Sequence, residues 1–102
     1  MGTVLAALDF RGDTDQLKAC YDKALLRIVE ISPARPLIHL AVPRDYGLMV
    51  CDVWDSEDAL RAFRQNAQIR EAIAASGLPE PTYRVFEIHN LGWPISATPM
   101  YR

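Results

Sequence analysis

The order of strand-like and helix-like segments constrains the fold of this chain more than any single motif does. Short apolar or alternating runs, which are typical of strands, occupy residues 3–10, 36–42, 47–54 and 82–90. A segment with a helical repeat follows the first run, and a second helical segment follows the third. The expected order is therefore strand, helix, strand, strand, helix, strand. This order predicts an antiparallel sheet that carries both helices on one face.

The first helix has signals at both ends. Asp13 or Thr14 can cap its start, because a short side-chain oxygen accepts a hydrogen bond from a free amide of the first turn. Ser32-Pro33 should end it, since the residue before a proline avoids helical geometry. Between these points apolar residues recur at steps of three and four, which predicts one buried stripe. The stripe consists of Leu17, Tyr21, Ala24, Ile28 and Ile31.

The second helix is expected to run without a break as far as Ser76. Asp55 or Ser56 can cap its start in the same way. Gly77 supplies the left-handed turn that ends many helices, and Pro79 prevents the helix from continuing. The residues predicted to face the core are Leu60, Phe63, Ala67 and Ala74.

Composition and charge exclude several classes of protein. The chain has 102 residues, half of them apolar, which suits one core; we expect a domain over residues 1–90 and a tail over residues 91–102. A net charge of -2 does not suit binding to nucleic acid or to an anionic membrane. No run approaches the roughly 20 apolar residues of a membrane span, and residues 1–10 lack the basic and long apolar regions expected of a secretory signal. A cytoplasmic protein is expected.

The expected fold is a ferredoxin-like βαββαβ unit that leaves the second face of its sheet uncovered. Apolar residues fall on this face too, and a chain of this size rarely exposes a large apolar patch to water. We therefore expect a homodimer in which two sheets pair face to face and enclose the interior of an α/β barrel. The tail over residues 91–102 is expected to lie along the partner subunit.

One segment resembles a known group of proteins. Residues 47–63, GLMVCDVWDSEDALRAF, resemble the third strand and second helix of the antibiotic biosynthesis monooxygenase-like and stress-responsive families of dimeric α/β barrels. The most motif-like part, VWDSEDA, encodes the end of a strand and the cap of a helix. Ile88-His89-Asn90 is similar to the last strand of many small bacterial members. The resemblance covers the topology of residues 1–90, and it implies the barrel fold rather than a particular reaction.

The catalytic residues of the characterised branches do not carry over to this chain. The haem-degrading branch implies a Trp and an iron-ligating His on the second helix, where this sequence has Phe63 and Ile73. The plant polyketide cyclase branch implies a Tyr and a His, where this sequence has Phe63 and Ile69. The side chains of Phe63, Ile69 and Ile73 cannot accept or donate a proton. The cofactor-independent quinone-forming monooxygenases have looser patterns and stay open.

Strand alternation places His39 and Asp52 on one face of the sheet. If the apolar residues of the second strand face the helices, His39 faces the barrel interior. Antiparallel pairing across the turn at residues 43–46 brings Asp52 opposite or diagonal to it. A carboxylate orients an imidazole and favours its charged form. The pair therefore predicts a proton carrier, with His39 and Asp52 as the candidate catalytic residues.

The same alternation predicts the other walls of a small-molecule pocket, which is usually apolar with a few polar groups. The expected substrate-binding residues on the inner face are Leu48, Val50, Trp54, Tyr83, Glu87 and His89, joined by Asp9 if Leu5 and Ala7 also face inward. The residues expected to face the helices are Met49, Cys51, Val53, Phe86 and Ile88. A shift of one residue in register would reverse all of these faces.

Structural roles are the alternative for each of these residues. His39 can be a histidine whose hydrogen bonds only stabilise the fold or an interface. His89 lies near a strand end, which suits a surface or dimer contact, and Trp54 precedes a helix cap, where it suits packing. Glu87 and Asp9 can be solvated residues at the edge of the sheet.

The sequence contains no pattern that is typical of a cofactor or metal site. Its histidines and cysteines are scattered, and it has neither a glycine-rich phosphate loop nor a GxSxG motif. We expect no cofactor and no metal. The sequence favours an enzyme that uses acid-base chemistry on an aromatic or polyketide-like molecule held between sheet and helices, as a monooxygenase, cyclase or isomerase. The alternative is a non-catalytic ligand-binding or stress-associated dimer.

Overall fold

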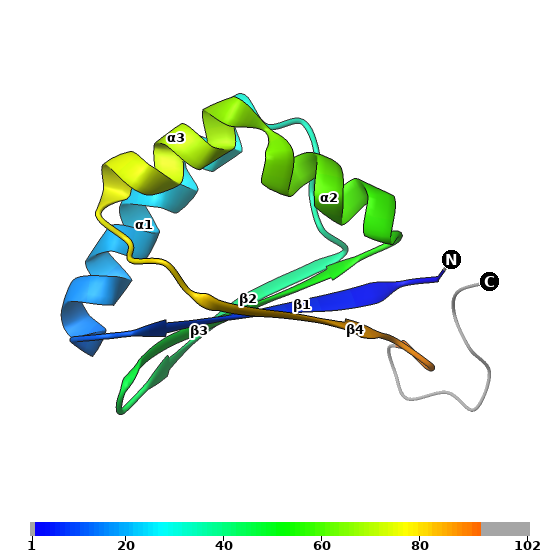
Figure 1. Ribbon diagram of the computed structural model, residues 1–102, viewed down its shortest axis with the longest axis horizontal. Coiled ribbons are helices and arrows are strands. Elements are labelled where there is room, and N and C mark those ends of the chain that lie inside the picture. The colour runs from blue at the N-terminus through cyan, green and yellow to red at the C-terminus, as the bar shows by residue number, and fades with distance from the viewer. Residues whose placement is uncertain (1, 93–102) are drawn as a thin grey trace.

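The fold is a four-stranded antiparallel sheet with three helices on one side (Figure 1). The computed structural model describes residues 2–92, so the expected position of the tail lies almost wholly outside the described residues. The strands follow the spatial order β2-β3-β1-β4. This is the ferredoxin-like α+β class expected from the sequence. The elements are β1 (Val4–Arg11), α1 (Thr14–Ile31), β2 (Ile38–Arg44), β3 (Gly47–Trp54), α2 (Glu57–Gln65), α3 (Ala67–Ser76) and β4 (Thr82–Glu87).

Helix α1 begins and ends where its capping residues predict. The Asp13 carboxylate accepts a hydrogen bond from the backbone N–H of Gln16 at 2.9 Å, which satisfies one of the free amides of the first turn. The helix ends at Ile31, and the N–H of Ser32 donates to the carbonyl of Ile28. Leu17 and Ala24 are buried against the sheet, as the apolar stripe predicts.

The expected second helix is two helices, and the expectation of one continuous helix was wrong. Asn66 ends α2 and also caps α3: its side-chain oxygen accepts hydrogen bonds from the N–H groups of Gln68 and Ile69, at 2.9 and 3.1 Å. A short amide side chain competes in this way with the helical backbone. The break also changes the buried side. Leu60, Ile69 and Ala72 are buried, whereas Ala67 and Ala74 are exposed, contrary to expectation.

His39 and Asp52 lie on the same face of the sheet, as expected. The helices cover this face, whereas the sequence predicted that they cover the other one. Asp52 pairs with His39 on β2 and with Ala6 on β1, and Ala6 in turn pairs with Val85 on β4. Ala6 packs in a cluster with Leu60 of α2, so this whole row lies under the helices. The residues expected to face the helices lie on the open side of the sheet instead: Met49, Cys51, Val53 and Phe86.

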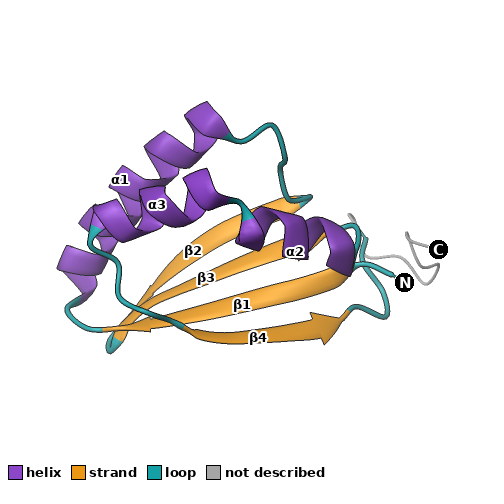
Figure 2. Ribbon diagram, turned by 45° about the horizontal axis from the view of Figure 1, so that its top comes forward, coloured by secondary structure: helices purple, strands orange, loops and turns teal. Residues whose placement is uncertain are grey.

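The three helices cover one face of the sheet (Figure 2). The core lies between these two layers. One cluster joins Val4, Ala6 and Trp54 to Leu60 of α2. A second cluster centres on Phe10, Leu17, Leu48 and Val50. Over the described part of the chain, none of the helices combines the length and the apolar character that a membrane crossing requires.

Candidate functional site

A cavity of about 290 Å³ lies in this layer, between the sheet and the helices. Its walls are mostly apolar and come from all three helices and from β1, β2 and β3. Among the apolar side chains are Leu8, Phe10, Ile28, Val50, Phe63 and Ile73. Besides the indole of Trp54, the polar side chains that line it within residues 2–92 are Tyr21, Arg35, His39 and Asp52. An apolar cavity with a few polar groups is the usual form of a small-molecule site.

Three of the polar side chains form one hydrogen-bonded chain. Imidazole Nδ1 of His39 is bonded to Oδ1 of Asp52, its direct partner across β2 and β3. Imidazole Nε2 is 2.5 Å from the hydroxyl oxygen of Tyr21, which reaches down from α1. The rings of Tyr21 and His39 are nearly parallel, with an angle of 6° between their planes. The predicted pairing of His39 with Asp52 is confirmed, and Tyr21 extends it into a relay of three groups.

The surroundings of the relay shift the pKa values of His39 and Tyr21. The hydrogen bond to Asp52 raises the pKa of His39 above its ordinary value of 6.5, although burial of the ring acts in the opposite direction. Burial raises the pKa of the Tyr21 hydroxyl, and the negative charge of Asp52 raises it further. Tyr21 is therefore a neutral hydroxyl at physiological pH. The side chains of His39 and Asp52 are 31% and 14% exposed, so the pair is sheltered but still open to proton exchange.

This arrangement can carry a proton in either direction. When His39 is neutral, its Nδ1–H donates to Asp52 and its Nε2 accepts the hydroxyl proton of Tyr21. When His39 is charged, both ring nitrogens donate, and the Tyr21 oxygen accepts. A group in the cavity that loses a proton to the Tyr21 oxygen can thus pass one proton on to His39. Asp52 orients the ring and stabilises the imidazolium that forms.

The other predicted site residues are divided between the cavity and other places. Val50 and Trp54 line the cavity, and Trp54 contacts Phe63 with ring centroids 5.0 Å apart. Leu48 lies in the neighbouring core, packed in the cluster with Phe10 and Leu17. Tyr83 packs beside Trp54 in the other core cluster rather than lining the cavity.

Three predicted polar residues lie away from the cavity. Glu87, the last residue of β4, lines a separate and smaller hollow together with Glu57 of α2. His89 is exposed and follows the last strand. Asp9 lies on the open side of the sheet, where its carboxylate is 3.8 Å from the guanidinium of Arg11.

Tyr83 is nevertheless held in a specific environment. The guanidinium of Arg64 lies 3.5 Å from the centre of its ring. Burial raises the pKa of its hydroxyl, while Arg64 acts in the opposite direction. Within residues 2–92, neither the Tyr83 hydroxyl nor the buried Nε1–H of Trp54 has a hydrogen-bond partner. This side of the core therefore contains two buried polar groups, the Tyr83 hydroxyl and the Trp54 N–H, that make no hydrogen bond within the described residues.

Two polar residues of the cavity, Tyr21 and Arg35, are not among the site residues expected from the sequence. Tyr21 was placed in the apolar stripe of the first helix, although its hydroxyl is the one polar group in that stripe. Arg35 follows the first helix in a segment that has no periodic pattern. Only the hydroxyl on an otherwise apolar helix face could have pointed to Tyr21, and nothing in the sequence indicated that Arg35 borders the cavity.

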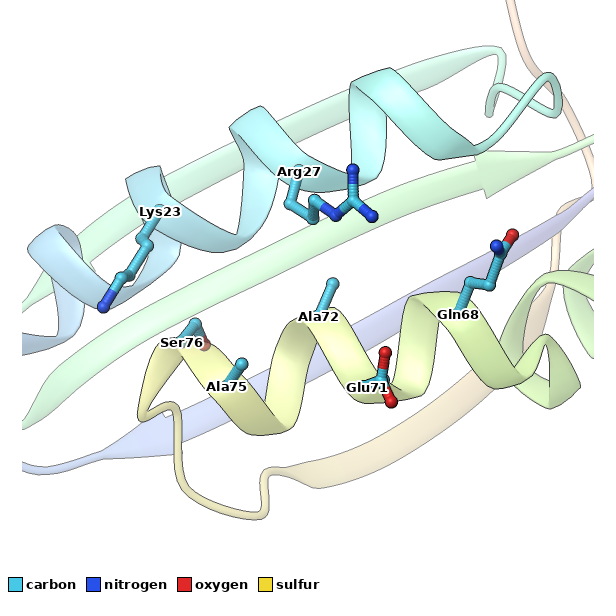
Figure 3. Close-up of a pocket in the computed structure, with 7 residues that line it drawn as sticks. All are labelled: Lys23, Arg27, Gln68, Glu71, Ala72, Ala75 and Ser76. Atoms are coloured by element: carbon cyan, nitrogen blue, oxygen red, sulfur yellow. The ribbon is translucent and has the colours of Figure 1, made fainter.

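A second hollow, of about 280 Å³, lies between α1 and α3 on the outer side of the helices (Figure 3). Lys23 and Arg27 extend from α1 toward α3, which contributes Gln68 and Glu71. Arg27 is paired with Glu30 on its own helix at 3.1 Å. Charges of both signs and their exposure to solvent are typical of a wet groove between two helices. The mostly apolar cavity between the sheet and the helices is therefore the better candidate for a functional site.

The donor groups needed for a metal site do not come together in the described residues. In that part of the chain, no three side chains of His, Cys, Asp or Glu are grouped so that they could hold a metal ion. Cys20 and Cys51 are free thiols on different elements, and burial raises the pKa of the Cys51 thiol.

Comparison with known proteins supports the fold. No protein family model matches the chain, and no curated protein matches it in sequence. The crystal structure of a candidate antibiotic biosynthesis monooxygenase from Chloroflexus aurantiacus J-10-fl is similar, with a TM-score of 0.64, 15% identity, and coverage of 88% of this chain and 97% of the other. A dimeric ferredoxin-like protein of unknown function from Thermobifida fusca YX has a TM-score of 0.59 and 23% identity over 86% of this chain and 92% of its own.

These similarities define the class of the chain by its architecture. At such low identity they show a shared fold, not a shared reaction. The chain is a ferredoxin-like α+β protein, and it shares this fold with the two solved structures.

Proposed function

We propose that this protein binds an aromatic or polyketide-like small molecule between the sheet and the helices, and that Tyr21, His39 and Asp52 move a proton during its conversion. The observation that carries this proposal is the continuous hydrogen-bonded relay in the wall of an apolar cavity. The cavity offers apolar and aromatic surface to a flat ring, and the relay offers one place where a proton can leave.

The proposed step is removal of a proton from a hydroxyl or an activated C–H group of the bound molecule. The Tyr21 oxygen accepts this proton as its own hydroxyl proton passes to His39 Nε2, and Asp52 stabilises the resulting imidazolium. The same step begins a monooxygenation, a cyclisation or an isomerisation without a cofactor. The candidate antibiotic biosynthesis monooxygenase of similar fold is named for the first of these reaction types.

We also propose that the protein is a homodimer that pairs through the open side of the sheet. Ile38, Leu40 and Phe86 are each more than 40% exposed on that side. Their burial would remove apolar surface from water, and the Thermobifida fusca protein of similar fold is described as dimeric. The cavity lies on the other side of the sheet, so the proposed dimer does not wall it. Location in the cytoplasm stays a prediction from the sequence.

Hydrogen exchange in a simple enolisable ketone tests the proton transfer. β-Tetralone has an aromatic ring and an acidic CH₂ group between that ring and its carbonyl. In D₂O, we expect the wild-type protein to accelerate deuterium incorporation at this carbon, followed by NMR. Because a positioned base contributes about 100-fold or more, His39→Gln should reduce the protein-catalysed rate by at least that factor. Tyr21→Phe should also slow it by removing the relay oxygen.

The alternative, a ligand-binding protein without turnover, gives a different result in the same experiment. Calorimetry would then show that β-tetralone binds, but the wild type would incorporate deuterium no faster than buffer does. Glu87→Gln is the matched control, because Glu87 lies outside the cavity. An equal loss of exchange in Glu87→Gln and His39→Gln would contradict the assigned roles.

A further inference from the structure

Arg35 is a fixed cation in the cavity wall. It follows the C-terminus of α1, and its guanidinium donates to backbone carbonyls there: Nη1 to Ser32 and Ala34, and Nη2 to Val29 at 3.0 Å. These three hydrogen bonds restrict the rotation of the side chain, although the residue is exposed to solvent. The same residue lines the cavity that contains His39 and Asp52. Arg35 therefore presents a preorganised positive charge to that cavity.

The hydrogen-bonding capacity of this guanidinium is not exhausted. Arginine has five N–H donors, and the three bonds to carbonyls leave Nε–H and one Nη2–H without an acceptor among residues 2–92. The carbonyl acceptors are neutral. Within residues 2–92, the carboxylates that form ion pairs are paired with residues other than Arg35, and the carboxylate of Asp52 is hydrogen-bonded to His39. The charge of Arg35 therefore has no carboxylate partner in this part of the molecule.

We propose that Arg35 binds a carboxylate group of the molecule that occupies the cavity. The inference rests on the proposed function and narrows its substrate class to an aromatic or polyketide-like acid. Two free N–H groups on one guanidinium match the two oxygens of a carboxylate. The carbon skeleton of such an acid would lie against the apolar wall, and its acidic hydroxyl or C–H group would meet Tyr21. Arg35 would then set the orientation of the ligand along the cavity.

A purely structural role explains the three carbonyl bonds of Arg35, because a cation near the C-terminus of a helix is favourable. That role makes no distinction between charged and neutral ligands. Discrimination between two ligands of the same shape therefore separates the two roles.

The probes are β-naphthoate and its neutral carboxamide, β-naphthamide, titrated by calorimetry at neutral pH and low salt. We expect the wild type to bind β-naphthoate about tenfold more tightly, the usual effect of one hydrogen-bonded ion pair. In Arg35→Gln this preference should disappear while the affinity for β-naphthamide stays the same. Unchanged binding of the neutral probe also shows that the variant is folded.

The control is Arg27→Gln, which removes a cation on α1 that lines the outer groove instead of the cavity. It should keep the full preference for β-naphthoate. If Arg35→Gln does not fold, Arg35→Lys is the second variant. Lysine keeps the positive charge but lacks the planar guanidinium, so the preference for β-naphthoate over β-naphthamide should decrease without disappearing.

Equal binding of both probes to the wild type, or a preference that survives in Arg35→Gln, would overturn the carboxylate inference and leave the cavity proposal intact. Failure of the wild type to bind either probe would count against both.

Discussion

His39 and Asp52 lie directly opposite each other on β2 and β3, and the imidazole Nδ1 is hydrogen-bonded to the carboxylate. The sheet itself imposes this contact, because directly paired residues of an antiparallel ladder bring their side chains within reach of each other. The bond fixes the ring so that Nε2 meets the hydroxyl of Tyr21. The backbone pairing of two strands thus determines the geometry of the proposed proton relay.

Replacing Asp52 should change the titration of His39. The hydrogen bond from Asp52 is the largest cause of the raised pKa of His39, whereas burial lowers it. In Asp52→Asn only the effect of burial remains, so the pKa of His39 should fall to or below its ordinary value of 6.5. NMR titration of the ring protons of His39 measures this shift. Asp9→Asn, which removes a carboxylate on the other side of the sheet, should leave the curve of His39 in place.

The same bond should make stability depend on pH in a defined direction. A histidine whose pKa is higher in the folded state stabilises that state fully below its unfolded value of 6.5, and this contribution is lost as the pH rises through the folded pKa. The difference in Tm between wild type and His39→Gln should therefore be largest on the acid side of pH 6.5 and should shrink at alkaline pH. Thermal unfolding followed by circular dichroism measures it. A difference that grows with pH would show that the sign is wrong.

The Asn66 cap between α2 and α3 should contribute measurably to stability. Asn66→Ala leaves the N–H groups of Gln68 and Ile69 without their side-chain acceptor and should lower the free energy of unfolding by about 1 kcal/mol. Urea titration measures the loss. Asn66→Asp, which keeps an acceptor oxygen, should restore most of it. Gln65→Ala, next to the cap, should have little effect; a loss as large as that of Asn66→Ala would mean that the cap is not the cause.

A charge on the open side of the sheet should dissociate the proposed dimer. Leu40 is 43% exposed there, and Leu40→Glu would place a carboxylate in the apolar interface. Light scattering should show a dimer for the wild type and a monomer for the variant, with unchanged circular dichroism. Leu26→Glu, on an exposed position of α1, should stay dimeric. A wild type that is monomeric at high concentration would contradict the proposal.

Much of the fold could be predicted because local signals and tertiary structure agree. The bounds of β3 match the sequence-based range of residues 47–54, and the caps Asp13 and Ser56 are those that the sequence offered. Alternation placed His39 and Asp52 on one face, because a period of two is a property of any strand.

The remaining features depend on tertiary packing, which the alternation of apolar and polar residues does not specify. Both faces of this sheet carry apolar residues, so the pattern could not say which face the helices cover, and the expected face was the wrong one. The break at Asn66 comes from one side chain within an otherwise helical pattern. The contact of Tyr21 with His39 joins elements that are distant in sequence, and only the packing of α1 on the sheet brings them together.

Successive residues of β3 lie on opposite faces of the sheet, so neighbouring positions contact different parts of the molecule. Val50, Asp52 and Trp54 border the cavity, while Met49, Cys51 and Val53 lie on the side proposed for dimerisation. A substitution at one position is therefore expected to affect the proposed ligand site, and a substitution at the next is expected to affect the proposed dimer. The proposed ligand site and the proposed dimer interface can therefore change independently of each other, although both include residues of a single strand of eight residues.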